Sequence, residues 1–254
     1  MTGNASTALV FGGSDGGGLG KRVEDWSGGS GPYKARYQAD ETLPEHTIYA
    51  PVEVRKGVKL PLIVWANGAC ASDGSASSNF LAEIASHGFM VIANGNAGKV
   101  WGGGVRNGPA PREGKTNAGM LTEAIDWVEK GANGGKFGEV DMEKVATGGI
   151  SCGGVEAYSG GVRDERVKVL GIHNTGAEQD FRDISPNASI IKAFANVGHG
   201  GTYGEKYGGK SGQLSTAFYK WTLNGDEDAK KLLFGQGGPL KEAGWNIDVS
   251  KWKQ

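Results

Sequence analysis

The chain contains only two cysteines, Cys70 and Cys152, among its 254 residues. Two thiols exclude a disulfide framework and a four-thiolate metal site, and neither cysteine lies in a C-x-x-C motif, so structural zinc is not expected. No apolar run approaches the roughly 18 residues that a membrane-spanning helix needs. The N-terminus also lacks the basic and apolar regions of a signal peptide, so we expect a cytoplasmic protein or a mature secreted form.

An excess of charge of one sign is also missing. The 27 Lys and Arg residues nearly balance the 28 Asp and Glu residues, which gives a net charge of -1. Such a chain has no broad field that would attract nucleic acid or an anionic membrane, and neither is an expected partner. Glycine, in contrast, is abundant, with 46 residues. Short glycine motifs therefore arise by chance in this chain, and each needs support from its surroundings.

The length fits one large domain with a substantial core. Residues 1–35 are rich in Gly and Ser, and their best apolar run is the short segment ALVF at 8–11. We therefore expect a loosely ordered N-terminal arm over 1–35, followed by a single domain over 36–254.

From residue 46 onward, apolar runs alternate with segments of helical periodicity. The pattern predicts strands at 46–50, 60–66, 89–93, 144–147 and 167–172, with helices over about 80–87, 120–128 and 153–159. Strands that alternate with helices are typical of a parallel sheet covered on both faces. The predicted fold class is therefore α/β, with a doubly wound, mostly parallel sheet.

The segment GGISCGG places Ser151 between two glycine pairs, at the junction of a predicted strand and a predicted helix. This is the position of a nucleophile elbow, because glycines on both sides allow a tight turn that lifts the serine hydroxyl above the sheet. An oxyanion hole would use the backbone N–H of Cys152 and a second N–H from the loop after an earlier strand. We expect Ala69 to supply the second donor, with Cys70 as the alternative. A glycine turn that only packs a helix against a sheet remains the structural alternative.

Five segments carry a resemblance to known proteins: LPLIVWANGAC, FLAEIASHGFMVIANG, GGISCGG, NVGHGGTYG and WTLNGDEDAKKLLFG. In this order they resemble the α/β-hydrolase superfamily, and within it a largely fungal group near the dienelactone hydrolases and the cutinase-like polyester hydrolases. The resemblance extends from about residue 30 to the C-terminus. It implies a serine esterase without a cofactor, with Ser151 as nucleophile and His199 as base. The implied substrate is a small-molecule or polymeric ester, and the oligomeric state is not indicated.

The choice of histidine can also be argued from the four candidates. His46 opens a strand and His87 ends a helix, so both have structural explanations. His173 follows a strand and is a second candidate at the catalytic edge. His199 lies in a glycine loop after an apolar run, downstream of Ser151, as the chain order nucleophile, acid, histidine requires. We therefore favour His199.

The acid of a catalytic triad is harder to place. The segment between Ile172 and His199 has room for only one strand, whereas the resemblance implies two. The chain is therefore expected to lack the acid-bearing segment and to be one strand short near its C-terminal half.

Three interpretations of the missing acid stay open. In the first, a carboxylate of the following loop orients His199, and Asp180 is our choice over Glu178 and Asp183. In the second, serine and histidine work without a third member, and activity is weak. In the third, the chain is an inactive homologue that serves as a small-molecule binding protein.

The two cysteines have their own hypothesis. If Ala69 and Cys152 both donate to one oxyanion, Cys70 must lie near Cys152, within the distance that a disulfide allows. A disulfide would clamp the oxyanion hole. Two small buried thiols in a reducing compartment are the alternative.

Overall fold

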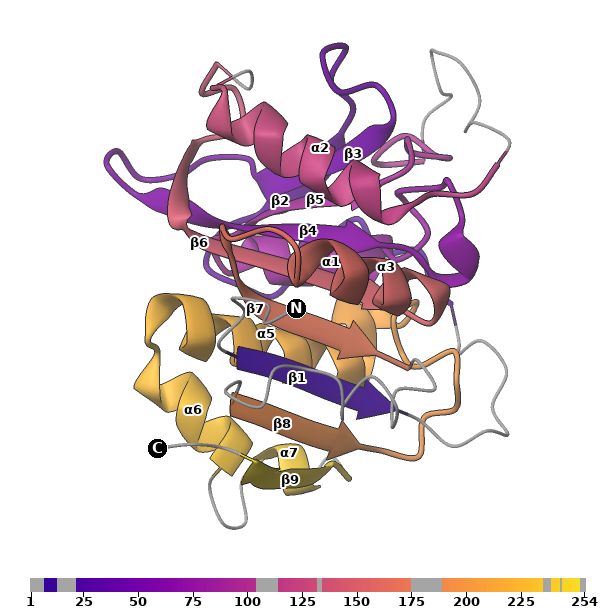
Figure 1. Ribbon diagram of the computed structural model, residues 1–254, viewed down its shortest axis with the longest axis vertical. Helices are drawn as coiled ribbons and strands as arrows, with labels where there is room; N and C mark the ends of the chain where they lie inside the picture. The colour runs from indigo at the N-terminus through magenta and orange to yellow at the C-terminus, as the bar shows by residue number, and fades with distance from the viewer. Residues whose placement is uncertain are drawn as a thin grey trace.

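The computed structural model describes residues 7–12, 22–103, 114–131, 134–174, 189–234, 239–242 and 244–251, and all structural statements below concern these parts of the chain. They form an α/β fold built on one mixed sheet of nine strands (Figure 1). Across the sheet, the strands are β2 (Ala35–Gln38), β3 (His46–Pro51), β5 (Met90–Asn94), β4 (Lys59–Ala66), β6 (Glu139–Ile150), β7 (Val167–His173), β1 (Thr7–Gly12), β8 (Ser189–Phe194) and β9 (Asn246–Lys251). The six strands from β5 to β8 in this order are parallel, and antiparallel pairs lie only toward the two edges.

Helices cover both faces of the sheet because its central strands are apolar on both sides. On one face, Ile63 and Trp65 of β4 share a core cluster with residues of α1 (Ser78–Ser86) and α5 (Gly209–Asn224). On the other face, Leu62 and Val64 pack in the cluster of α2 (Ala118–Glu129) and α3 (Cys152–Gly161). This alternation follows from the two-residue period of a strand. The prediction of a mostly parallel sheet with helices on both faces is confirmed.

The end of α5 and the start of α6 lie at a glycine and an aspartate, residue types that are common at these helix positions. Gly225 adopts the left-handed conformation that commonly ends a helix, directly after α5. The carboxylate of Asp226 then accepts a 2.9 Å hydrogen bond from the N–H of Ala229 and caps α6 (Glu227–Phe234). The last short elements are the 3-10 helix η2 (Lys206–Gly208) before α5 and α7 (Pro239–Glu242) after α6.

The N-terminal strand is the main departure from expectation. β1 lies between β7 and β8 and runs parallel to both, and in Figure 1 it is the indigo arrow between two orange ones. Phe11 pairs with His173 on one side, and Gly12 pairs with Phe194 on the other. The prediction of a loosely ordered arm over 1–35 is therefore wrong for residues 7–12.

The sheet was expected to be one strand short near its C-terminal half. β1 supplies a strand there, between β7 and β8. Ala8 and Leu9 are fully buried, so β1 is part of the core. Residues 30 and 31 are also anchored: Ser30 donates to the carboxylate of Glu83 from both its N–H and its hydroxyl, and the N–H of Gly31 donates to the hydroxyl of Ser86. This arrangement has little signal in the sequence, because the apolar run at 8–11 is short and its partner strands lie far along the chain.

Candidate active site

Ser151 occupies a sharp turn between β6 and α3. Its backbone has φ 54° and ψ -122°. This conformation is strained for any residue with a side chain and is typical of functional turns. The flanking glycines make the turn possible. A Cβ on Gly149 would lie 2.1 Å from the carbonyl oxygen of Gly153, and one on Gly153 would lie 2.2 Å from that of Ala66. The two glycines are therefore required by close backbone approach.

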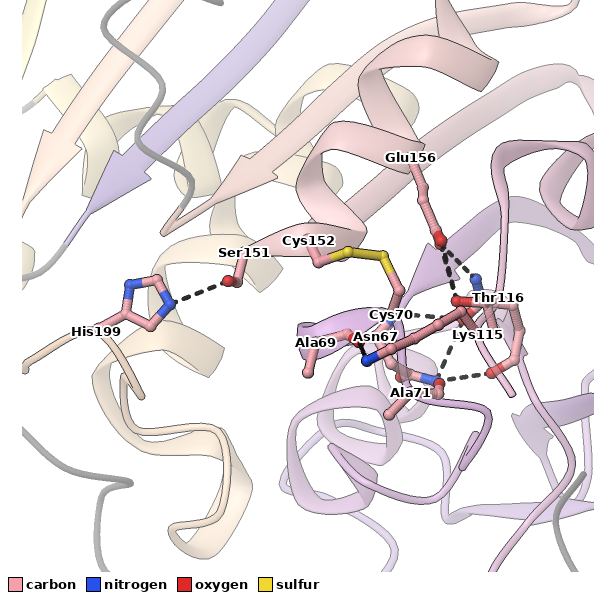
Figure 2. Close-up of a disulfide and its surroundings, with 11 residues drawn as sticks. Asn67, Ala69, Cys70, Ala71, Lys115, Thr116, Ser151, Cys152, Glu156 and His199 are labelled. Atoms are coloured by element: carbon pink, nitrogen blue, oxygen red, sulfur yellow. Dashed lines mark hydrogen bonds between the residues drawn. A yellow bond between two sulfur atoms is a disulfide. The ribbon is translucent and has the colours of Figure 1, made fainter. Parts of the chain in front are cut away.

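The structure brings Ser151 and His199 together from positions 48 residues apart. The Nε2 atom of His199 lies 3.0 Å from the Ser151 hydroxyl oxygen, and Figure 2 shows the imidazole directed at the serine. His199 is exposed and Ser151 is half-buried, so both side chains are accessible. With Nε2 unprotonated, the hydroxyl donates to it, which is the geometry that a general base needs.

The end of β7 holds both halves of this pair. The N–H of Ser151 donates a 2.8 Å hydrogen bond to the carbonyl of His173. The side-chain amide of Asn174 donates a 2.7 Å hydrogen bond to the carbonyl of His199. Asn174 is buried and has a φ of 46°, which asparagine tolerates better than most residues. The turn at Ser151 and the loop at His199 are therefore both held by the end of β7.

His173, the rejected alternative, is a core residue. Its ring is fully buried and packs edge-on against the rings of Trp65 and Phe80. Nδ1 lies 3.2 Å from the hydroxyl of Tyr203. Burial lowers the pKa of this imidazole well below its usual value, so His173 is neutral in the folded protein. The choice of His199 as the histidine beside Ser151 agrees with this geometry.

The loop after β4 lies against the turn at Ser151 as the 3-10 helix η1 (Gly68–Cys70), and a Cβ on Gly68 would lie 3.4 Å from the side chain of Ile150. Ala69 and Cys70 have positive φ angles of 56° and 49°. The N–H of Cys70 already donates to the carbonyl of Asn67 over 3.2 Å. The N–H groups of Ala69 and Cys152 have no acceptor within the described parts of the chain. This favours Ala69 over Cys70 as the second oxyanion donor.

Cys70 and Cys152 form a disulfide, with their Cα atoms 5.3 Å apart (Figure 2). The disulfide joins η1 to the first residue of α3. It therefore fixes the two backbone segments that carry the candidate oxyanion donors relative to each other. Of the two alternatives for the cysteines, the structure shows the disulfide and excludes the pair of free thiols.

The candidate acids are not placed by the structure. Asp180, Glu178 and Asp183 lie between Asn174 and Ser189, outside the described residues. No carboxylate of the residues that are described contacts the imidazole of His199. The role of Asp180 therefore stays a prediction.

The position of β1 reveals a candidate that the sequence analysis missed. The carboxyl end of β1 lies beside that of β8, the strand that leads to His199. The first carboxylate after Gly12 in the sequence is Asp15, in the segment GGSD, which also lies outside the described residues. The sequence signal is an apolar run followed by an acid, but it lies upstream of Ser151, whereas the chain order nucleophile, acid, histidine places the acid downstream.

Comparison with known proteins adds no family assignment. A scan of protein-family models and a search of curated proteins found no match to this chain. In the described residues, no helix has both the length and the apolar character needed to cross a membrane.

Proposed function

We propose that this protein is a serine hydrolase of the α/β-hydrolase type that acts on carboxylic esters. The observation that carries the proposal is the 3.0 Å approach of His199 Nε2 to the hydroxyl of Ser151, at a turn between a strand and a helix. A nucleophile and a base within hydrogen-bond reach are the signature of nucleophilic catalysis. The place of β1 between β7 and β8 adds support, because a strand there is what the resemblance to this superfamily implies.

The chemistry follows from the roles of these groups. His199 takes the proton from Ser151 as its oxygen attacks the ester carbonyl, and the carbonyl oxygen becomes an oxyanion. The N–H groups of Ala69 and Cys152 stabilise that charge, and the N-terminus of α3 adds its dipole. His199 then gives the proton to the leaving alcohol as the ester C–O bond breaks. Water, deprotonated by His199, cleaves the acyl-enzyme and restores the serine.

The third group of the triad is proposed from strand position. Asp180, the choice from sequence, would approach from the loop after β7. Asp15 would approach from the segment after β1, which is the direct neighbour of β8. Asp15 is only three residues beyond Gly12, the last residue of β1, and three residues span at most about 10 Å. We therefore favour Asp15 as the residue that orients His199.

Covalent labelling with a fluorophosphonate probe tests the proposal. The folded protein should form one adduct at Ser151, and Ser151→Ala should abolish it together with hydrolysis of a p-nitrophenyl acyl ester. Ser159→Ala, a neighbouring serine on α3, is the matched control and should keep both. Loss of the nucleophile or the base costs a triad enzyme several orders of magnitude in kcat. A folded wild-type protein that gives neither an adduct nor turnover would favour the alternative, a catalytically silent binding protein.

A further inference from the structure

A buried carboxylate lies behind the oxyanion loop, and the mechanism above does not use it. Glu156 is in the second turn of α3, on the side of the disulfide away from His199 (Figure 2). Its side chain is buried, with 7% of the residue exposed, and no basic side chain of the described residues pairs with it. Two neutral groups satisfy it instead: the side-chain amide of Asn94 and the hydroxyl of Thr116. A carboxylate buried with only neutral donors is costly, so its retention calls for a reason.

The first contact leads to the start of the oxyanion loop. Asn94 donates from its amide nitrogen to Glu156 over 2.9 Å. This orients its amide oxygen toward Asn67, which donates to that oxygen from both its N–H and its side-chain amide, each over 3.2 Å. The amide of Asn67 also donates 2.7 Å and 3.2 Å hydrogen bonds to the carbonyls of Asn94 and Ala71. Glu156 therefore determines that the oxygen of the Asn94 amide, and not its nitrogen, is directed at Asn67.

The second contact leads to the end of the same loop. The hydroxyl of Thr116 lies 3.1 Å from each oxygen of the Glu156 carboxylate. The N–H of Thr116 donates a 2.9 Å hydrogen bond to the carbonyl of Cys70. The preceding residue, Lys115, donates from its ammonium to the carbonyl of Ala69 over 2.7 Å. One carboxylate thus anchors, through one residue on each side, both ends of the segment from 67 to 71.

This anchoring matters because the loop is held in an unfavourable conformation. Ala69 and Cys70 are consecutive residues with side chains and positive φ, and such backbone persists only where the surroundings enforce it. The disulfide holds the loop at one point, Cys70. It does not set the direction of the Ala69 N–H, which depends on the peptide planes on either side.

We propose that Glu156 is a positioning residue for the oxyanion hole, which aims the N–H of Ala69 by holding Asn94 and Thr116. This inference rests on the proposed function, because an oxyanion hole has a role only if the protein catalyses ester hydrolysis. Glu156 touches neither Ser151 nor His199 through any contact of the described residues, so it takes no part in proton transfer.

Two substitutions separate positioning from packing. Glu156→Gln keeps an acceptor oxygen for both Asn94 and the Thr116 hydroxyl, which share one carboxylate oxygen in the wild type, whereas Glu156→Met keeps a similar volume and removes every acceptor. Loss of one oxyanion donor costs about 100-fold to 1,000-fold in kcat, and a misaimed donor should cost less. We expect Glu156→Met to lower kcat by roughly 10-fold to 100-fold with KM within about twofold, because the contact acts on the transition state. Glu156→Gln should stay within about threefold of the wild type.

A second readout is independent of catalysis. Hydrogen exchange of the amides at 67–71 should be faster in Glu156→Met and unchanged in Glu156→Gln. Glu165→Met, which removes an exposed carboxylate beyond α3, is the matched control for both measurements. Unchanged exchange and unchanged kcat in a folded Glu156→Met protein would overturn the proposal. If the wild type shows no Ser151-dependent turnover, the proposed function fails, whereas the exchange data still decide whether Glu156 holds the loop.

Discussion

Asn174 reaches across from the end of β7 and donates a 2.7 Å hydrogen bond to the backbone carbonyl of His199. The residue just before Asn174 is His173, and its carbonyl accepts a hydrogen bond from the N–H of Ser151. The relative position of Ser151 and His199 is therefore set at one corner of the sheet, by hydrogen bonds to the adjacent residues His173 and Asn174. A change at this corner should alter the Ser151–His199 approach without touching either side chain.

Replacing Asn174 tests that support. Asn174→Gly and Asn174→Ala both remove the donor, but only glycine tolerates a φ of 46° without strain. We expect both variants to lower kcat at least about 10-fold, because small misplacements of catalytic groups are costly. Asn174→Ala should also melt at a lower temperature than Asn174→Gly. Steady-state kinetics and thermal melts check both expectations, and wild-type kcat in Asn174→Gly would show that the bond is dispensable.

The identity of the acid can be decided by two isosteric substitutions. We expect Asp15→Asn to lower kcat by up to about 10,000-fold, since an asparagine at the acid position favours the wrong tautomer of the histidine. Asp180→Asn should stay within several-fold of the wild type. The reverse result would return the role to Asp180, as the sequence predicted. If both Asp15→Asn and Asp180→Asn keep the kcat of the wild type, Ser151 and His199 work without either carboxylate.

The disulfide should contribute to both stability and turnover. It joins cysteines 82 residues apart, and closing such a loop stabilises a fold by roughly 2 to 5 kcal/mol. The double variant Cys70→Ser, Cys152→Ser should melt about 5 to 15 °C lower than the oxidised wild type. It should also have a lower kcat, since η1 is no longer tied to α3. A reductant should shift the melting temperature of the wild type toward that of the variant and leave the variant unchanged; equal melting temperatures throughout would contradict the prediction.

Acid should destabilise the protein through its buried histidines. Burial lowers the pKa values of His173 and His46, so below about pH 6.5 the unfolded chain binds protons that the folded chain does not. The free energy of unfolding then falls with falling pH, by up to about 1.4 kcal/mol per pH unit for each histidine. His173→Phe, which stays neutral, should lose its share of that slope between pH 6.5 and 5. Urea unfolding at several pH values measures the slope, and identical slopes in both proteins would disprove the assignment.

Local patterns in the sequence predicted most of the architecture. Apolar runs identified the strands on either side of Ser151, and the glycines at 149 and 153 identified its turn, because backbone approach there leaves no room for a side chain. The pairing of His199 with Ser151 followed from chain order. These features depend on neighbours in sequence or on a single rule of topology.

What the sequence did not reveal depends on contacts between distant segments. The insertion of β1 between β7 and β8 is invisible in a four-residue apolar run, because its partners are Val169 and Ser189. The contacts of Glu156 are equally remote in sequence, since they come from the loop before α2 and from the end of β5. Burial of a glutamate has no local signature, and only the assembled sheet shows what the carboxylate holds.

The placement of β1 also has a consequence for how the chain is made. β1 leaves the ribosome long before its partners β7 and β8, which lie more than 150 residues further along the chain. Until then its backbone amides and carbonyls bind water rather than a neighbouring strand, and a nascent chain in this condition is prone to associate with other strands. Formation of the sheet from such distant pairs is inherently slow. The protein therefore acquires a continuous sheet only after synthesis has passed β8, and shorter translation products would leave that strand without a site.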